Sequence, residues 1–255
     1  MGKIFGAWAL GIYKLASTIA NLPATEITHM ISQVTFPAYV KLQDDLFRLR
    51  ESCLKSLYLT AVLSSFLTAL IFVSIHDFSL YFLGEKWLQI VTITQILVIA
   101  GFIRSLAAIL GPVFQAIGKP EIDTFSQIIR LSVFLTFIYP LSVKFGLVGI
   151  AYAVLLSIFF TCIFLYFRVV KIIGLKLVRT FKILSFPLSG VIIVTIFYVF
   201  RNLNFGNKAV IWDFLFLFFE LLLLVCAFVL FDFRYAPFKI TTLIKNLRND
   251  NRRNL

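Results

Sequence analysis

Polar and apolar residues separate onto two sides of one long predicted helix near the start of the chain. Over residues 9–40, at about 100° per residue, most polar side chains fall within an arc of roughly 100°. This polar stripe comprises Lys14, Thr18, Asn21, Thr25, Thr28, Ser32 and Thr35, with Glu26, His29 and Gln33 beside it. The opposite side carries Ala16, Ala20, Ala24, Ile27, Ile31 and Val34. Such a helix reaches about 45 Å, more than the roughly 30 Å hydrocarbon core, so we expect it to span with a tilt or a kink at Pro23.

The polar stripe must face other helices or a water-filled cavity, because polar side chains that face lipid are costly. Its hydroxyls are also compatible with simple hydrogen bonds between helices. An ionisable group within a span indicates a functional site, which favours the cavity. We therefore interpret Asn21, Glu26, His29 and Gln33 as cavity-lining residues. For His29, a hydrogen-bonded interior histidine and a proton carrier both stay open.

The rest of the chain alternates apolar spans with polar connectors, which gives about seven spans in all. Further spans are predicted at 56–75, 88–117, 122–143, 147–167, 183–200 and 210–231. In the overlong third span, Gly101 and the Gly111-Pro112 pair predict a kink. In the charged connector 41–55, Asp44-Asp45 is expected to begin or cap an interfacial helix.

Composition fixes the class of protein. Of the 255 residues 60% are hydrophobic and 14% are charged, and the mean hydropathy is +0.97, which excludes an ordinary soluble domain. The thirty Phe lie among Leu, Ile and Val without period-2 alternation, which argues against a membrane β-barrel. The expected fold is all-α, a polytopic transmembrane helix bundle.

The net charge of +12 arises from Lys and Arg in the connectors, so we expect no nucleic-acid partner. Sixteen Lys and Arg lie in the connectors 41–55, 118–121 and 168–182 and the tail 232–255, whereas the alternating connectors hold five. The positive-inside rule then predicts a multi-pass protein of the cell inner membrane with a cytoplasmic C-terminus. With seven spans the N-terminus lies outside, and because no cleaved signal peptide is recognisable, we expect further spans to precede this chain.

These patterns divide the chain into four predicted parts. They are a five-span bundle (1–167), a basic cytoplasmic connector (168–182), two additional spans (183–231) and a basic cytoplasmic tail (232–255). Cys53, Cys162 and Cys226 have no ligand-like spacing and predict neither a disulfide framework nor a metal site. No catalytic or cofactor-binding motif is present, so we assign no catalytic residue, metal or cofactor.

Two arginines lie within predicted spans. Arg104 shares a helical face with Ala108, Gly111 and Gln115, and Arg130 follows Ser126 and Gln127 by one turn. Either arginine could form a structural ion pair with Glu26. However, the predicted spans hold three cations, Lys14 and the two arginines, against the single carboxylate of Glu26. This excess of positive charge favours an anionic ligand, which can accept two hydrogen bonds from one guanidinium. The predicted substrate-binding residues are therefore Lys14, Arg104 and Arg130, and Gln115 and Gln127 join the cavity-lining set.

Several segments resemble those of a known protein family and occur in the same order. They are FGAWALGIYKLASTIANLP (5–23), QVTFPAYVKLQDD (33–45) followed by RLR, FLGEKW (82–87), AIGKP (116–120) and GLVGIAYA (146–153). Together they cover about residues 5–160. This arrangement is similar to the start of the second half of bacterial polysaccharide flippases, including O-antigen flippases of lipopolysaccharide biosynthesis, in the multidrug, oligosaccharidyl-lipid and polysaccharide exporter superfamily.

The resemblance implies two helical bundles around a central cavity, with this chain as the C-terminal bundle plus one or two extra helices. It implies transport of an undecaprenyl-pyrophosphate-linked oligosaccharide to the periplasmic leaflet by alternating access. The expected partners are this lipid-linked oligosaccharide, membrane lipids and a separately encoded N-terminal bundle. The roles of Lys14, Arg104 and Arg130 come from their charge and position and not from the resemblance, and Arg104 and Arg130 lie outside these segments. Two alternatives stay open, an inactive truncated fragment and a membrane enzyme of the same pathway that uses His76, Asp77 and Glu85.

Overall fold

The computed structural model describes residues 2–175, 180, 184–185 and 189, which all lie in the first of the chain's two units, 1–208 and 209–255. The elements are α1 (Gly2–Ala20), the π-helix η1 (Pro23–Ile27), α2 (Thr28–Lys41), α3 (Leu46–Phe78), the π-helix η2 (Ser79–Leu83), the 3₁₀-helix η3 (Glu85–Trp87), α4 (Gln89–Ala108), α5 (Leu110–Ala116) and α6 (Glu121–Ile173). This part of the chain holds no β-strand, as predicted for an all-α fold. Most of the predicted span at 183–200, and all of the predicted span at 210–231 and the tail 232–255, lie outside the described residues.

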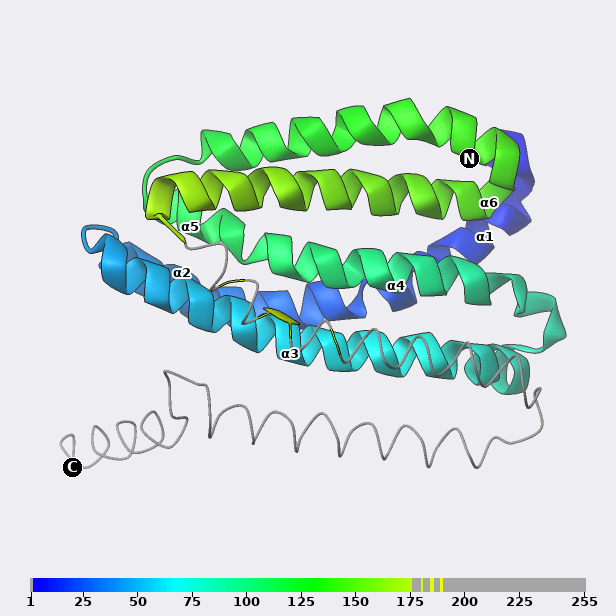
Figure 1. Cartoon of the computed structure of the whole chain (residues 1–255). Helices are drawn as coiled ribbons and strands as arrows, with labels where there is room; N and C mark the ends of the chain where they lie inside the picture. The colour runs from blue at the N-terminus through cyan, green and yellow to red at the C-terminus, as the bar shows by residue number, and fades with distance from the viewer. Residues whose placement is uncertain (1, 176–179, 181–183, 186–188, 190–255) are drawn as a thin grey trace. The chain divides into compact units, whose positions relative to one another are not determined.

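Among the residues that the structure describes, three helical segments are long and apolar enough to cross a membrane, at Leu46–Leu83, Gln89–Ala116 and Glu121–Ile173. The chain is therefore a membrane protein. Helix α6 changes direction at Gly146, whose φ of 59° is left-handed, and its two arms run side by side (Figure 1). This reversal confirms the boundary between the predicted spans 122–143 and 147–167, whereas the total of about seven spans stays a prediction.

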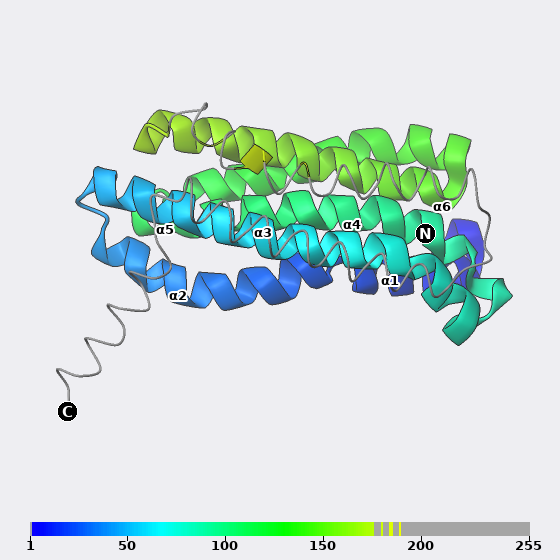
Figure 2. The same ribbon diagram turned by 60° about the horizontal axis from the view of Figure 1, so that its bottom comes forward.

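Helix α4 is the central element, since it contacts α1, α3 and α6 (Figures 1 and 2). Buried Ser105 on α4 donates a hydrogen bond to Ser64 Oγ on α3 at 2.8 Å, as small polar residues do between membrane helices. At Gly101 an added Cβ would lie 2.5 Å from the Ala20 carbonyl oxygen. The backbones of α1 and α4 are therefore in direct contact, which explains the glycine at this position.

The predicted kink in the third span is a break between α4 and α5. Helix α4 ends at Ala108, and α5 begins at Leu110. Pro112 explains the position, because a proline ring clashes with the carbonyl of the fourth residue before it, which is Ala108 here. The break precedes the Gly111-Pro112 pair and confirms the prediction.

The first predicted helix is interrupted at Pro23, where the π-helix η1 begins. Up to Ile31 the predicted apolar side is buried. Thr28 of the polar stripe is also buried, as a stripe that faces other helices requires, whereas Val34 of the apolar side is 74% exposed. A π-turn inserts one extra residue, which rotates every later side chain by about 100° relative to a regular helix. The buried side of α2 is therefore shifted by one position.

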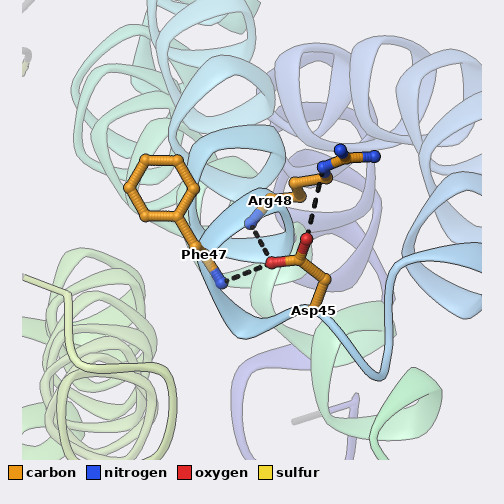
Figure 3. Close-up of polar contacts among 3 residues, drawn as sticks. All are labelled: Asp45, Phe47 and Arg48. Carbon is orange, nitrogen blue, oxygen red and sulfur yellow. Dashed lines mark hydrogen bonds and ion pairs between the residues drawn. The ribbon is translucent and has the colours of Figure 1, made fainter.

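Helix α3 begins inside the predicted connector 41–55. Asp45 is its N-cap: Oδ1 accepts hydrogen bonds from Phe47 N at 3.1 Å and Arg48 N at 3.0 Å (Figure 3). The other carboxylate oxygen forms an ion pair with Arg48 Nε at 3.2 Å. The predicted capping role is confirmed for Asp45.

Candidate functional site

A polar cavity of about 290 Å³ lies between α4–α5 and the two arms of α6. Its lining comprises Arg104, Ala107, Ala108, Gly111, Pro112 and Gln115 from α4 and α5, Asp123, Ser126, Gln127 and Arg130 from the first arm of α6, and Ile158, Thr161 and Leu165 from the second arm. The α4–α5 wall holds the residues that share one face in the sequence prediction, Arg104, Ala108, Gly111 and Gln115. Small residues on this wall leave space in front of the arginine.

Two arginines from different helices line this cavity. Arg104 Nη1 donates a hydrogen bond to Asn21 Oδ1 at 2.8 Å, which fixes one side of the guanidinium against the end of α1. Its Nε is buried and has no hydrogen-bond partner within the described part of the chain. A buried donor of this kind calls for a ligand or a water molecule. Arg104 is also among the residues that line the cavity, so part of its side chain is accessible to a bound group.

The alternative ion pair with Glu26 does not form. In the part of the chain that the structure describes, neither Arg104 nor Arg130 has a carboxylate oxygen within 4.0 Å. Glu26 is exposed and accepts a long hydrogen bond from Thr25 Oγ1 at 3.4 Å. The two arginines therefore give the cavity uncompensated donors suited to an anion.

The structure separates the predicted site residues into two groups. Arg104, Arg130, Gln115 and Gln127 line the cavity, and Asn21 reaches it through its bond to Arg104. The second group, which is exposed along α1, η1 and α2, comprises Lys14, Glu26, His29 and Gln33. Lys14 precedes Asn21 by two helical turns, about 10 Å along the axis, and is not among the lining residues of this cavity.

Sequence analysis missed Asp123 as a member of the site. Its side chain lies over Gly111, where an added Cβ would be 3.7 Å from Asp123 Oδ1. Asp123 is the second residue of the predicted span 122–143, close to the connector at 118–121, and it belongs to the first turn of α6. The usable signal is spacing, because Asp123, Gln127 and Arg130 recur at intervals of four and three and share a face.

The residues of the enzyme alternative lie at the C-terminal end of α3 and in η3. His76 Nδ1 lies 3.2 Å from Asp77 Oδ1, and Glu85 is exposed in η3. Over the described ranges, no group of three or more His, Cys, Asp or Glu residues is placed to hold a metal ion. Cys53 and Cys162 are free thiols, and Cys226 lies outside these ranges.

Comparison with known proteins finds relatives that are named for polysaccharide biosynthesis, and one that is named as a membrane protein. Residues 1–92 match the family model described as polysaccharide biosynthesis protein. The resemblance predicted from the sequence is confirmed, because residues 1–92 are similar to this family of polysaccharide biosynthesis proteins. No solved structure matches the chain.

Three relatives illustrate the relationship. The chain is 30% identical over 171 residues to an uncharacterized membrane protein in the cps region of Klebsiella pneumoniae, and 30% identical over 177 residues to the lipopolysaccharide biosynthesis protein WzxC of Escherichia coli K12. Each match covers 67% of this chain and 35% of the relative. The teichuronic acid biosynthesis protein TuaB of Bacillus subtilis is 35% identical over 123 residues, which cover 48% of this chain and 25% of TuaB. The chain thus spans about a third of the length of the first two relatives.

Proposed function

We propose that the chain serves cell-surface polysaccharide biosynthesis by moving a lipid-pyrophosphate-linked oligosaccharide across the cell inner membrane. One observation carries the proposal: Arg104 and Arg130 line a single cavity, and among the described residues neither is paired with a carboxylate. Phosphate oxygens accept two parallel hydrogen bonds from a guanidinium, so the pair fits a pyrophosphate. The relatives are named for polysaccharide biosynthesis, which supports a transport role in that process rather than an enzymatic one.

The size of the cavity limits which part of the substrate it holds. At about 290 Å³ it lies at the small end of the range for ligand sites, which is roughly 300–1,000 Å³. It admits a phosphate-bearing group and one adjoining group rather than a whole oligosaccharide. The remaining sugars and the lipid therefore extend beyond this cavity.

A second helical bundle completes the transport path in this proposal. Lys14, Glu26 and His29 are exposed along α1, η1 and α2, although these helices belong to a membrane protein. A charged side chain at the centre of a membrane helix costs about 2.5–3.5 kcal/mol on insertion scales. A partner bundle that covers this face removes the cost and supplies the opposite wall for alternating access. The charge distribution of the connectors supports a cytoplasmic C-terminus.

The test is polysaccharide export in bacteria that lack their own flippase and express the chain together with an N-terminal flippase bundle. Arg104→Gln and Arg130→Gln should each lower surface polysaccharide about tenfold or more, since a hydrogen bond to a charged group contributes about 1.5–3 kcal/mol. Arg130→Lys keeps the positive charge but loses the paired donors of the guanidinium. Its surface polysaccharide should therefore lie between that of the wild type and that of Arg130→Gln. Lys119→Gln is the matched control, because Lys119 is exposed and outside the cavity lining.

Membrane abundance of every variant is measured in the same cells, so that lost export is not confused with lost protein. Normal export by the double variant of Arg104 and Arg130 would overturn the proposed role of the cavity. Full export by residues 1–255 without an added bundle would overturn the proposed need for a partner.

A further inference from the structure

The two ends of the cavity differ in charge. Arg104 and Arg130 lie at one end, and Asp123 lies over Gly111 at the other. Seven residues separate Asp123 from Arg130 and also Arg104 from Gly111, which corresponds to about 10 Å along each helix. Within the described residues, Asp123 has no arginine or lysine nitrogen within 4.0 Å. The carboxylate is thus not there to neutralise the arginines by direct contact.

Uncharged polar groups lie between these two ends and beyond one of them. Gln127 follows Asp123 by one helical turn and so lies between the two ends, whereas Gln115 lies one turn beyond Gly111, past the Asp123 end. Ser126 is fully buried, and its Oγ donates to the Asp123 carbonyl at 2.7 Å and lies 3.5 Å from Asp123 Oδ1. A glutamine side chain offers both donors and an acceptor. The middle of the cavity therefore suits a group that carries several hydroxyls.

A carboxylate in an anion-binding cavity weakens the binding of a bare anion, because like charges repel each other. The same carboxylate accepts hydrogen bonds through two oxygens and donates none, so it favours a ligand that brings hydroxyl donors. A group that repels the wrong ligand and binds the right one is a common source of specificity. Asp123 can therefore repel a bare anion that binds Arg104 and Arg130, and it can accept hydrogen bonds from an anion that carries hydroxyls.

We propose that Asp123 selects a phosphate that is attached to a sugar over a free phosphate. In this arrangement the phosphate binds Arg104 and Arg130, and the hydroxyls of the adjoining sugar donate to the Asp123 carboxylate. This inference rests on the proposed function, because it names the part of the substrate that the same cavity recognises. It assigns to Asp123 a role in specificity rather than in holding the phosphate.

The experiment is calorimetric titration of the purified full chain in lipid nanodiscs with inorganic phosphate and with hexose 1-phosphates (glucose, galactose and N-acetylglucosamine 1-phosphate). The wild-type chain should bind at least one hexose 1-phosphate about tenfold more tightly than inorganic phosphate. Asp123→Asn should weaken that hexose 1-phosphate about tenfold, whereas inorganic phosphate should bind equally or more tightly. Glu121→Gln is the matched control, since it removes one negative charge from the same turn of α6 but lies outside the cavity lining.

Opposite or unequal responses of the two probes to Asp123→Asn support the inference. Equal changes for both probes, or equal affinities of the wild-type chain for both, overturn it, and the wild-type comparison needs no variant to fold. Failure of this inference leaves the proposed function standing if Arg130→Gln still abolishes binding of both probes. Absence of any phosphate binding to the wild-type chain, together with normal export by the arginine variants, contradicts both.

Discussion

Replacing Gly101 with alanine tests how closely α1 and α4 pack beside the site. The new Cβ would lie 2.5 Å from the Ala20 carbonyl oxygen, whereas ordinary contacts are 3.4–4 Å, so the two helices must separate by about 1 Å. Overpacking of this kind costs about 1–3 kcal/mol. The better helix propensity of alanine returns about 0.5–1 kcal/mol. We therefore expect Gly101→Ala to destabilise the chain by about 1–2 kcal/mol.

The consequence extends to the cavity, because Arg104 and Asn21 lie next to Gly101 and Ala20 on the same helices. Separation of the backbones should lengthen the 2.8 Å hydrogen bond between Arg104 and Asn21 and weaken phosphate binding. Thermal unfolding in one detergent, followed by size-exclusion chromatography, gives the stability. Gly11→Ala on α1 is the matched control, because an added Cβ there meets no atom within 4 Å. Equal unfolding temperatures for the two variants would refute the close contact.

Two further predictions concern topology and capping. In a chain whose native cysteines are replaced by alanine, Glu85→Cys should react with an impermeant thiol reagent on intact cells, whereas Gln43→Cys should react only after the membrane is opened. Both positions are exposed, so labelling of both from outside would contradict the orientation. Asp45→Ala should lower the free energy of unfolding by about 1 kcal/mol, whereas Asp45→Asn, which keeps a cap acceptor, should lose much less. Equal losses for Asp45→Ala and Asp44→Ala would show that the N-cap bonds in Figure 3 contribute little.

Local chemistry explains which structural features could be predicted. Proline and glycine act through their own backbone geometry, so the irregularity at Pro23, the break before Pro112 and the reversal at Gly146 follow from single positions. The exposure of Val34 could not be predicted from a regular period, because one π-turn changes the phase of every later residue.

The candidate site depends on contacts between helices, which sequence periodicity does not specify. Periodicity identified the polar faces around Arg104 and Arg130 separately. Only the packing of α4 against α6 brings both arginines into one cavity. Lys14 shows the opposite case, since it has the charge of a site residue but is not among the residues that line the cavity. Asp123 was missed because its position after a turn concealed its place on the face of Arg130.

The most direct measurement is translocation of a fluorescent lipid-pyrophosphate-linked oligosaccharide in proteoliposomes that contain the chain and an N-terminal bundle. Probe that has moved to the outer leaflet is quantified by its accessibility to a membrane-impermeant quencher. We predict translocation by the wild-type pair and none by the pair that carries both Arg104→Gln and Arg130→Gln, at equal protein incorporation. Equal translocation by the two pairs would contradict the account, as would none by the wild-type pair.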